Sequence, residues 1–251
     1  MIDVAFTRAG VRQADVAVVV DVLRATSTAT QALAAGYRRV LFAETIERAR
    51  ELRGPGRVLA GERHCVKPAG FDQGNSPTEA VDRRGDELIL ATTNGAPTVV
   101  AATQHASRVF LGCLLNLRSV LCALRRLEGS SELVLQIVCS GTNEDVALED
   151  AYFAGRLSAA LPGCRTDAAL VAEGVARAFE SPLRALAQSA DARALCDAGL
   201  GDDVAFCARE SELDVVPVVI AANSSVAALV DAEAIAEALR VVAWADDTVS
   251  V

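Results

Sequence analysis

Histidine is scarce in this 251-residue sequence, and its cysteines lack the spacing of a metal site or a disulfide framework. It has two histidines, too few for a multi-histidine metal centre, and its seven cysteines form no C-x-x-C pair, which argues against a zinc ribbon or a disulfide framework. No uninterrupted apolar run reaches the roughly 18 residues that a membrane helix needs. The N-terminal MIDVAFTRAG has no apolar core of a signal peptide. We therefore expect a cytoplasmic protein with reduced thiols and no membrane partner.

Positive charge is also in short supply. The 24 lysines and arginines face 33 aspartates and glutamates, so the formal net charge is −9 at pH 7. Nucleic acid is not an expected partner, because a surface that binds it would be basic. Lys67 is the lone lysine, and the other 23 basic residues are arginines. An individual arginine is therefore weak evidence of a functional role, whereas this lysine is slightly stronger evidence. Hydrophobic residues make up 52% of the chain, which suffices for a folded core.

Apolar runs alternate with short polar loops and alanine-rich amphipathic stretches over much of the chain. Strands that alternate with helices favour right-handed crossovers, so we predict an α/β fold, a layered α/β/α arrangement with a mainly parallel or mixed sheet. The predicted strands are residues 14–20, 39–43, 57–60, 88–91, 109–112 and 133–138. The first predicted helix ends at Gly36, and the others cover residues 46–53, 97 onward, 116–127 and 145–161.

The C-terminal part follows a different pattern. Residues 173–199 are predicted helices with a break at Ser181-Pro182, residues 204–209 an edge strand, and residues 225–240 a closing helix. Residues 213–222 are a predicted strand at a sheet edge, because Pro217 cannot donate to a neighbouring strand. No Gly/Ser/Pro-rich linker divides the chain, so we expect one unit over residues 1–251. The alternative is two closely packed lobes, about 1–130 and 131–251.

Polar side chains follow directly after several predicted strands. Ligands of open α/β sheets bind beyond the carboxyl ends of parallel strands, where helix N-termini also offer N–H groups to anions. Helix capping would explain the serines, threonines and asparagines taken singly, but it does not require charged residues at the same edge. We therefore expect one crevice lined by Asp21, Arg24, Glu62, Arg63, Thr92, Thr93, Asn94, Gly95, Asn116, Cys139, Ser140, Gly141 and Thr142.

The longest predicted loop, residues 61–77, concentrates reactive side chains. A loop of this length in a compact α/β protein is usually functional or disordered, and Val66 and Phe71 argue against a disordered linker. Arginine and lysine bind phosphate anions, whereas carboxylates bind divalent cations, so the loop favours a site over a solvated surface segment. Besides Glu62 and Arg63 it contributes Lys67, Asp72, Asn75 and Ser76.

A second acidic cluster lies on the helix predicted at residues 145–161. Asp145 and Glu149 share one face at i, i+4 spacing, and Asp150 lies beside alanines that would face the sheet. Stabilisation by the helix dipole is the simpler explanation of these acids, but a buried Asp150 would need a partner or a metal.

Several familiar mechanisms are excluded by spacing. No arginine lies six residues after a cysteine, as a cysteine-phosphatase loop requires, and Leu23 occupies the position of the second aspartate of an aspartyl-phosphate hydrolase. The sequence also has neither a G-x-x-x-x-G-K-[ST] phosphate loop nor a G-x-G-x-x-G dinucleotide motif.

The motifs nevertheless occur together in one known family. DVLRATST at residues 21–28, GER at 61–63, Lys67 with GFDQGNSP at 70–77, TTNG at 92–95, Asn116, and CSGT at 139–142 with Glu149-Asp150 resemble the 2-phosphosulfolactate phosphatase family. The resemblance extends over residues 16–161 and, more weakly, over 189–207 and 216–217. His64-Cys65 departs from the expected pattern.

The resemblance implies a magnesium-dependent phosphatase that converts 2-phospho-3-sulfolactate to 3-sulfolactate and phosphate, a step of coenzyme M biosynthesis in archaea. The expected catalytic residues are Asp21, Arg24, Glu62, Asp72 and Cys139, and the expected ligands of Mg²⁺ are Asp21, Glu62, Asp72, Glu149 and Asp150.

The cations Arg24, Arg63 and Lys67 would divide between the phosphate, carboxylate and sulfonate of such a substrate. The attacking group stays open between water, a carboxylate and Cys139. We favour water or an aspartate, because nothing basic accompanies Cys139 in the sequence.

Three other functions stay open. The first is phosphatase action on another phosphorylated 2-hydroxy acid, and the second is non-catalytic binding of a small polyanion. The third, a purely structural domain that forms homo-oligomers, leaves the polar strand ends unexplained.

Overall fold

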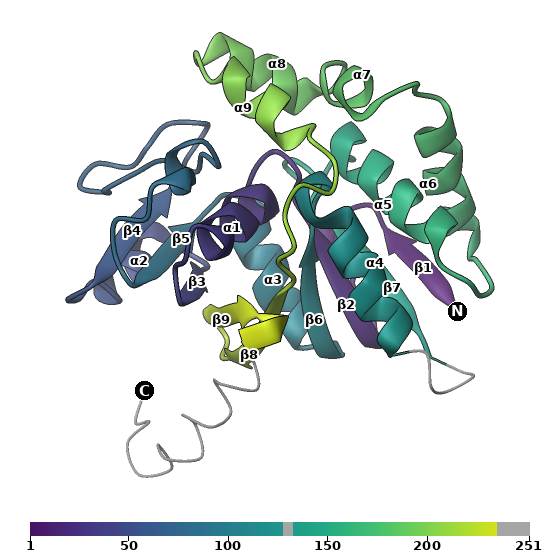
Figure 1. Cartoon of the computed structure of the whole chain (residues 1–251), viewed down its shortest axis with the longest axis horizontal. Helices are drawn as coiled ribbons and strands as arrows, with labels where there is room; N and C mark the ends of the chain where they lie inside the picture. Colours follow the sequence, from purple (N-terminus) through teal and green to yellow (C-terminus); the bar gives the residue numbers. More distant parts are fainter. Residues whose placement is uncertain (128–132, 235–251) are drawn as a thin grey trace.

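The computed structural model describes residues 1–127 and 133–234, and a nine-stranded mixed sheet runs through them in the order β1-β7-β2-β6-β8-β9-β3-β5-β4 (Figure 1). The predicted α/β fold is thereby confirmed. The strands are β1 (Ile2–Ala5), β2 (Ala14–Val20), β3 (Arg39–Ala43), β4 (Arg57–Gly61), β5 (Glu87–Ala91), β6 (Ala106–Gly112), β7 (Leu135–Cys139), β8 (Pro217–Ala222) and β9 (Val226–Asp231).

The sheet consists of two parallel blocks joined by an antiparallel hairpin. Strands β1, β7, β2 and β6 are parallel to one another, and so are β3, β5 and β4. Strands β8 and β9 pair with each other, with β6 and with β3, each time antiparallel. Figure 1 shows this yellow hairpin between the two blocks.

The carboxyl ends of the two blocks meet although their polarity is opposite. Three successive antiparallel pairs separate β6 from β3, so in a flat sheet the blocks would run in opposite directions. Yet Gly95, after β5, lies against Asp21, after β2: a Cβ at Gly95 would be 2.5 Å from Asp21 Oδ2. The sheet therefore twists strongly between the blocks, which brings both sets of strand ends to one place.

Helices α1 and α3 fill the space between the two blocks. One buried cluster joins Val19 of β2 and Phe42 of β3 with Ala29 of α1 and Val99 of α3. The outer face of the first block is covered by α4, α5 and α6, and that of the second by α2. The helices are α1 (Ala25–Ala34), α2 (Ile46–Glu51), α3 (Gly95–Thr103), α4 (Leu117–Arg126), α5 (Leu148–Ala160), α6 (Asp167–Arg177), α7 (Pro182–Leu186), α8 (Ala190–Asp197) and α9 (Gly201–Cys207).

Three C-terminal predictions are wrong. Residues 204–209, predicted as an edge strand, lie mostly in α9. The strand with Pro217 is inside the sheet, where proline is tolerated because it is the first residue of β8. The segment predicted as a helix at residues 225–240 forms strand β9 in its first part. Asn223 Oδ1 accepts from the N–H groups of Ser225 and Val226 and so closes a hairpin turn between β8 and β9. Residues 235–240 lie outside the described residues.

The second half of the chain is interleaved with the first. Strand β7 lies between β1 and β2, and α8 and α9 lie above the strand ends near α1 (Figure 1). Within residues 1–127 and 133–234, no helix combines the length and apolar character needed to cross a membrane.

Candidate active site

A pocket of about 260 Å³ lies where the carboxyl ends of both blocks meet helix α8. Its polar part comes from the segments after β2, β4, β5 and β7, and its apolar part from Leu23 and α8. The lining residues are Asp21, Leu23, Arg24, Glu62, His64, Cys65, Asn75, Thr92, Thr93, Asn94, Thr142, Asn143, Asp191, Ala194, Leu195 and Ala198.

Asp21 lies at the bottom of the pocket, between β2 and α1. Its Oδ1 accepts from the Ala25 N–H at 2.9 Å, and Oδ2 lies against Gly95, where a larger residue would collide with it. Burial raises the pKa of Asp21 to about 7, opposed by the Ala25 N–H and reinforced by the charges of Asp191 and Glu62. Asp21 therefore lacks sufficient positive charge around it.

Glu62 is held in a fixed orientation across the pocket. The N–H and hydroxyl of Thr93 donate to its Oε1 at 2.8 and 3.0 Å, and the Cys65 N–H donates to its Oε2 at 3.1 Å. His64 and Cys65 have positive φ values in a turn closed by Arg63 and Val66. This turn places the His64 and Cys65 side chains at the pocket.

A second layer of acids lies behind Asp21, at the start of α5. The Val22 and Gly141 N–H groups donate to Asp150 at 2.8 and 3.2 Å, and burial together with Glu149 and Asp21 raises its pKa. Burial and then Asp191 raise the pKa of Glu149 to about 8. Glu149 Oε2 has no hydrogen-bond partner among the described residues.

Asp191, near the start of α8, connects the two layers of acids. Its carboxylate accepts from the Thr142 hydroxyl, and its charge raises the pKa of both Glu149 and Asp21. Helix α8 thus contributes a carboxylate as well as apolar side chains to the pocket.

Among the described residues that line the pocket, Arg24 is the only arginine or lysine. Its side chain is 3% exposed, and Nη1 lies 2.6 Å from Oδ2 of the buried Asp203 in α9. The charge of Arg24 is therefore already balanced by an acid outside the pocket.

Eight predicted site residues line the pocket: Asp21, Arg24, Glu62, Asn75, Thr92, Thr93, Asn94 and Thr142. Asn75 is buried, and its Oδ1 has no hydrogen-bond partner among the described residues. Gly95, Gly141, Glu149 and Asp150 are close behind the lining, as the contacts of Gly95 with Asp21 and of Gly141 with Asp150 and the charge effects of Glu149 and Asp150 show, and the buried Ser140 precedes Gly141 in the chain.

The structure does not bring six other predicted residues to the pocket lining. Asp72 accepts from the Leu59 N–H at 2.8 Å and lies 3.4 Å from Arg53, so it secures its own loop. Asn116 is likewise committed, because its amide donates to the Leu111 and Val215 carbonyls. The remaining four are Arg63, Lys67, Ser76 and Cys139.

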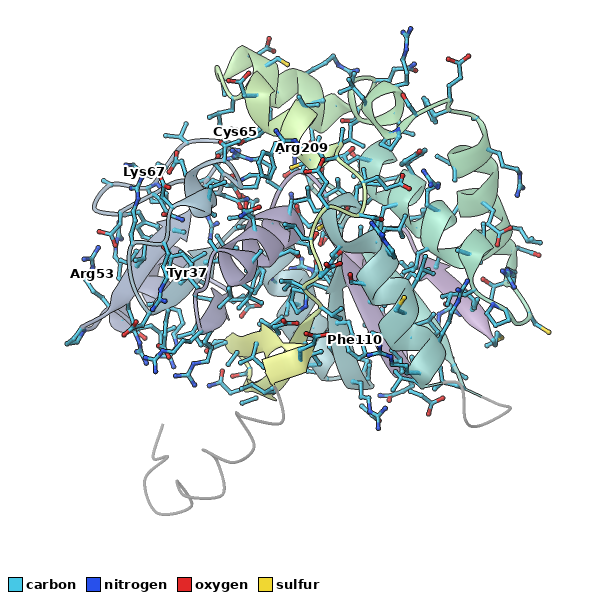
Figure 2. All side chains as sticks on the ribbon, viewed as in Figure 1. Tyr37, Arg53, Cys65, Lys67, Phe110 and Arg209 are labelled. Carbon is cyan, nitrogen blue, oxygen red and sulfur yellow. The ribbon has the colours of Figure 1, made fainter. Side chains whose placement is uncertain are left out.

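The contacts or the burial of each of these four residues explain why it does not line the pocket. The Arg63 guanidinium donates to the Glu62 carbonyl and the Ser76 hydroxyl to Asp203. Lys67 is exposed, on the outer part of the loop compared with Cys65 (Figure 2). Cys139 is fully buried, and burial, Asp150 and Glu149 raise its pKa well above the ordinary value, which disfavours a reactive thiolate.

The sequence prediction missed Asp191 and Asp203. Both lie in the first turn of short helices, where an acid has the ordinary explanation of the helix dipole. The weaker resemblance over residues 189–207 was the available signal. Asp145, in turn, precedes α5 and pairs with Thr142 in a turn, so it does not share a helix face with Glu149.

The donor set suits Mg²⁺ better than a transition metal. Among the described residues no three histidine, cysteine or acidic side chains form a preassembled metal cage. Magnesium commonly uses one or two carboxylates, with water and substrate phosphate completing its shell. Asp21, Glu62 and Asp191 all line the pocket and could offer hard oxygen ligands, and the charges of Glu62 and Asp191 raise the pKa of Asp21, a repulsion that a bound cation would relieve.

Comparison with known proteins agrees with the motif resemblance. Residues 5–222 match the family described as 2-phosphosulpholactate phosphatase. A protein of Thermus thermophilus named "Probable 2-phosphosulfolactate phosphatase" is 39% identical over 210 residues, 81% of this chain and 87% of that protein. A protein of the same name from Pseudothermotoga lettingae is 36% identical over 222 residues, 88% of this chain and 96% of that protein.

Proposed function

Because the chain belongs to the 2-phosphosulpholactate phosphatase family, we propose that it hydrolyses 2-phospho-3-sulfolactate to 3-sulfolactate and phosphate with the help of Mg²⁺. The predicted enzyme class, a hydrolase of phosphoric monoesters, is that of the family. Two relatives whose printed names specify this substrate align with at least four fifths of the chain.

The excess of acids in the pocket is the observation that carries the magnesium proposal. Asp21, Glu62 and Asp191 line the pocket, whereas the charge of Arg24 is balanced by Asp203. A substrate with phosphate, carboxylate and sulfonate groups would be repelled by this surface. When bound, Mg²⁺ supplies the positive charge that both the acids and the phosphate oxygens need.

Within this proposal, the residues of the chain divide the remaining tasks. Arg24 donates to phosphoryl oxygens from the pocket wall, and the amides of Asn75 and Asn94 orient the substrate. Asp21 presents its carboxylate beside the N-termini of α1 and α3, whose N–H groups favour anions.

The attack comes from water or from Asp21, and Cys139 takes no part because it is buried behind the pocket. Trapping of the intermediate separates the two routes. Attack by the carboxylate displaces the alcohol of the substrate and leaves an acyl phosphate on Asp21, which borohydride reduces to homoserine, whereas direct attack by water leaves nothing on Asp21 to reduce.

The decisive experiment measures phosphate release from 2-phosphosulfolactate and from its analogue without the sulfonate. Each is assayed with Mg²⁺, with EDTA, and with EDTA followed by excess Mg²⁺. We expect turnover that EDTA abolishes and Mg²⁺ restores, with a higher kcat/KM for the sulfonated substrate. Full turnover by metal-free protein would contradict the magnesium proposal, and equal kcat/KM values would show that the sulfonate is not recognised.

A further inference from the structure

The buried carboxylate of Asp203 joins three segments that are distant in the sequence. Its Oδ2 accepts from Arg24 Nη1 at 2.6 Å, and its Oδ1 accepts from the hydroxyls of Ser76 and Thr78 at 2.7 and 2.9 Å. Asp203 is 1% exposed and is not one of the residues that line the pocket. All of its described contacts are therefore to the protein.

Docking of α9 does not by itself require a buried charge. Val204 and Cys207 of the same helix are already buried in the main apolar cluster. A buried ion pair loses much of its attraction to desolvation, so apolar residues commonly stabilise such a contact equally well. The carboxylate needs an explanation other than packing.

Arg24 has a competing partner in Asp21, because both residues line the pocket. Asp21 lies near enough for the positive charge of Arg24 to lower its pKa, and the long arginine side chain could pair with it directly. Such a pair would occupy both the cation and the carboxylate that face the ligand. Pairing with Asp203 keeps the two apart.

We propose that Asp203 is a positioning residue that holds the Arg24 guanidinium in the pocket wall, and that Ser76 and Thr78 orient Asp203 instead of binding the substrate. The inference rests on the proposed function, in which Arg24 binds phosphoryl oxygens. It also accounts for the serine of the GFDQGNSP motif, whose hydroxyl is turned to Asp203.

A double-mutant cycle on orthophosphate binding tests this inference. The dissociation constant of inorganic phosphate is measured by calorimetry with Mg²⁺ for wild type, Asp203→Asn, Arg24→Ala and the double variant. The neighbouring Asp202→Asn is the control, because Asp202 is exposed on the same helix. We expect Asp203→Asn to weaken binding about tenfold, Asp202→Asn to change it less than about twofold, and Asp203→Asn to add nothing to Arg24→Ala.

A merely structural role of Asp203 would give a different result. It would lower the melting temperature and weaken phosphate binding by the same factor with or without Arg24, and that outcome would overturn the proposal. So would an Asp203→Asn affinity equal to that of the control. If Asp203→Asn does not fold, Ser76→Ala, which keeps the ion pair, takes its place in the cycle with an expected effect of about threefold.

Because the experiment measures the binding of inorganic phosphate, it also tests this inference separately from the proposed function. Orthophosphate binding needs no turnover, so a wild-type protein that binds phosphate without hydrolysing 2-phosphosulfolactate would contradict only the substrate assignment. If phosphate binds too weakly to titrate, the same cycle is read from kcat/KM, again with Asp202→Asn as the control.

Discussion

Two groups of buried acids in this protein have opposite surroundings. Glu87 of β5 accepts from the Nε atoms of Arg39 and Arg57, each at 2.8 Å. Burial alone would raise the pKa of Glu87, but the hydrogen bonds and charges of the two arginines lower it. Glu173 of α6 is similar, because Arg165 and the Ser158 hydroxyl outweigh burial and lower its pKa.

The pocket acids lack such partners. The pKa values of Asp21 and Glu149 are raised to about 7 and 8, and the nearby Arg24 is paired with Asp203. Arginine is abundant in the sequence, so its scarcity at the pocket is a property of the fold. The difference teaches that the charges of Glu87 and Glu173 are neutralised within the protein, whereas the pocket acids keep the uncompensated charge that the proposed Mg²⁺ would balance.

The largest expected effect comes from replacing one acid of each group by its amide. We expect Asp21→Asn to lower kcat by roughly 10²–10⁴-fold without lowering the free energy of unfolding, because it removes an acid that is unfavourably buried. Glu87→Gln should leave kcat within about twofold and lower the free energy of unfolding by about 1–2 kcal/mol, since the two partly exposed arginines lose a charged acceptor.

Steady-state kinetics and urea unfolding of both variants in the same buffer check this pair. An Asp21→Asn protein that unfolds easily but keeps its kcat would reverse the comparison.

The pH dependence of stability is the second way to separate the two groups. Asp21 and Glu149 bind protons more tightly in the folded than in the unfolded chain, so between about pH 4 and pH 8 the metal-free protein loses stability as the pH rises. Glu87 and Glu173 have lowered pKa values, so their contribution is lost as the pH falls below about 4.5.

Urea unfolding in EDTA from about pH 3 to pH 9 measures both changes of the free energy of unfolding. Asp21→Asn should reduce its fall between about pH 4 and pH 8, and Glu87→Gln should reduce its loss below about pH 4.5. A wild-type stability that rises steadily from pH 5 to pH 8 would show that the pocket acids are not destabilising.

The smallest expected effect concerns the buried thiol behind the pocket. Cys139→Ser should keep kcat within about threefold of wild type, because a buried thiol of raised pKa supplies no thiolate to attack the substrate. A folded Cys139→Ser protein, verified by circular dichroism, with kcat reduced a thousandfold would restore the cysteine as a nucleophile.

The strand-end residues show how far the sequence could lead. Asp21, Glu62 and the Thr92–Asn94 segment were predictable because each follows an apolar run that forms a strand, and the motifs identified the family. The β8–β9 hairpin was not, because the alanine-rich residues after Ser225 favour a helix locally, and pairing with β3 and β8 overrides that preference.

The sequence by itself determined most of the local elements, most of the strand-end chemistry and the family. Only the tertiary structure decided which acids are neutralised, which partner Arg24 takes, and that Asp72 and Cys139 lie away from the pocket. The physical reason is that burial and charge interactions depend on distances in space. Arg24 and Asp203 are 179 positions apart, and the strong twist of the sheet and the docking of α8 and α9 bring such residues together.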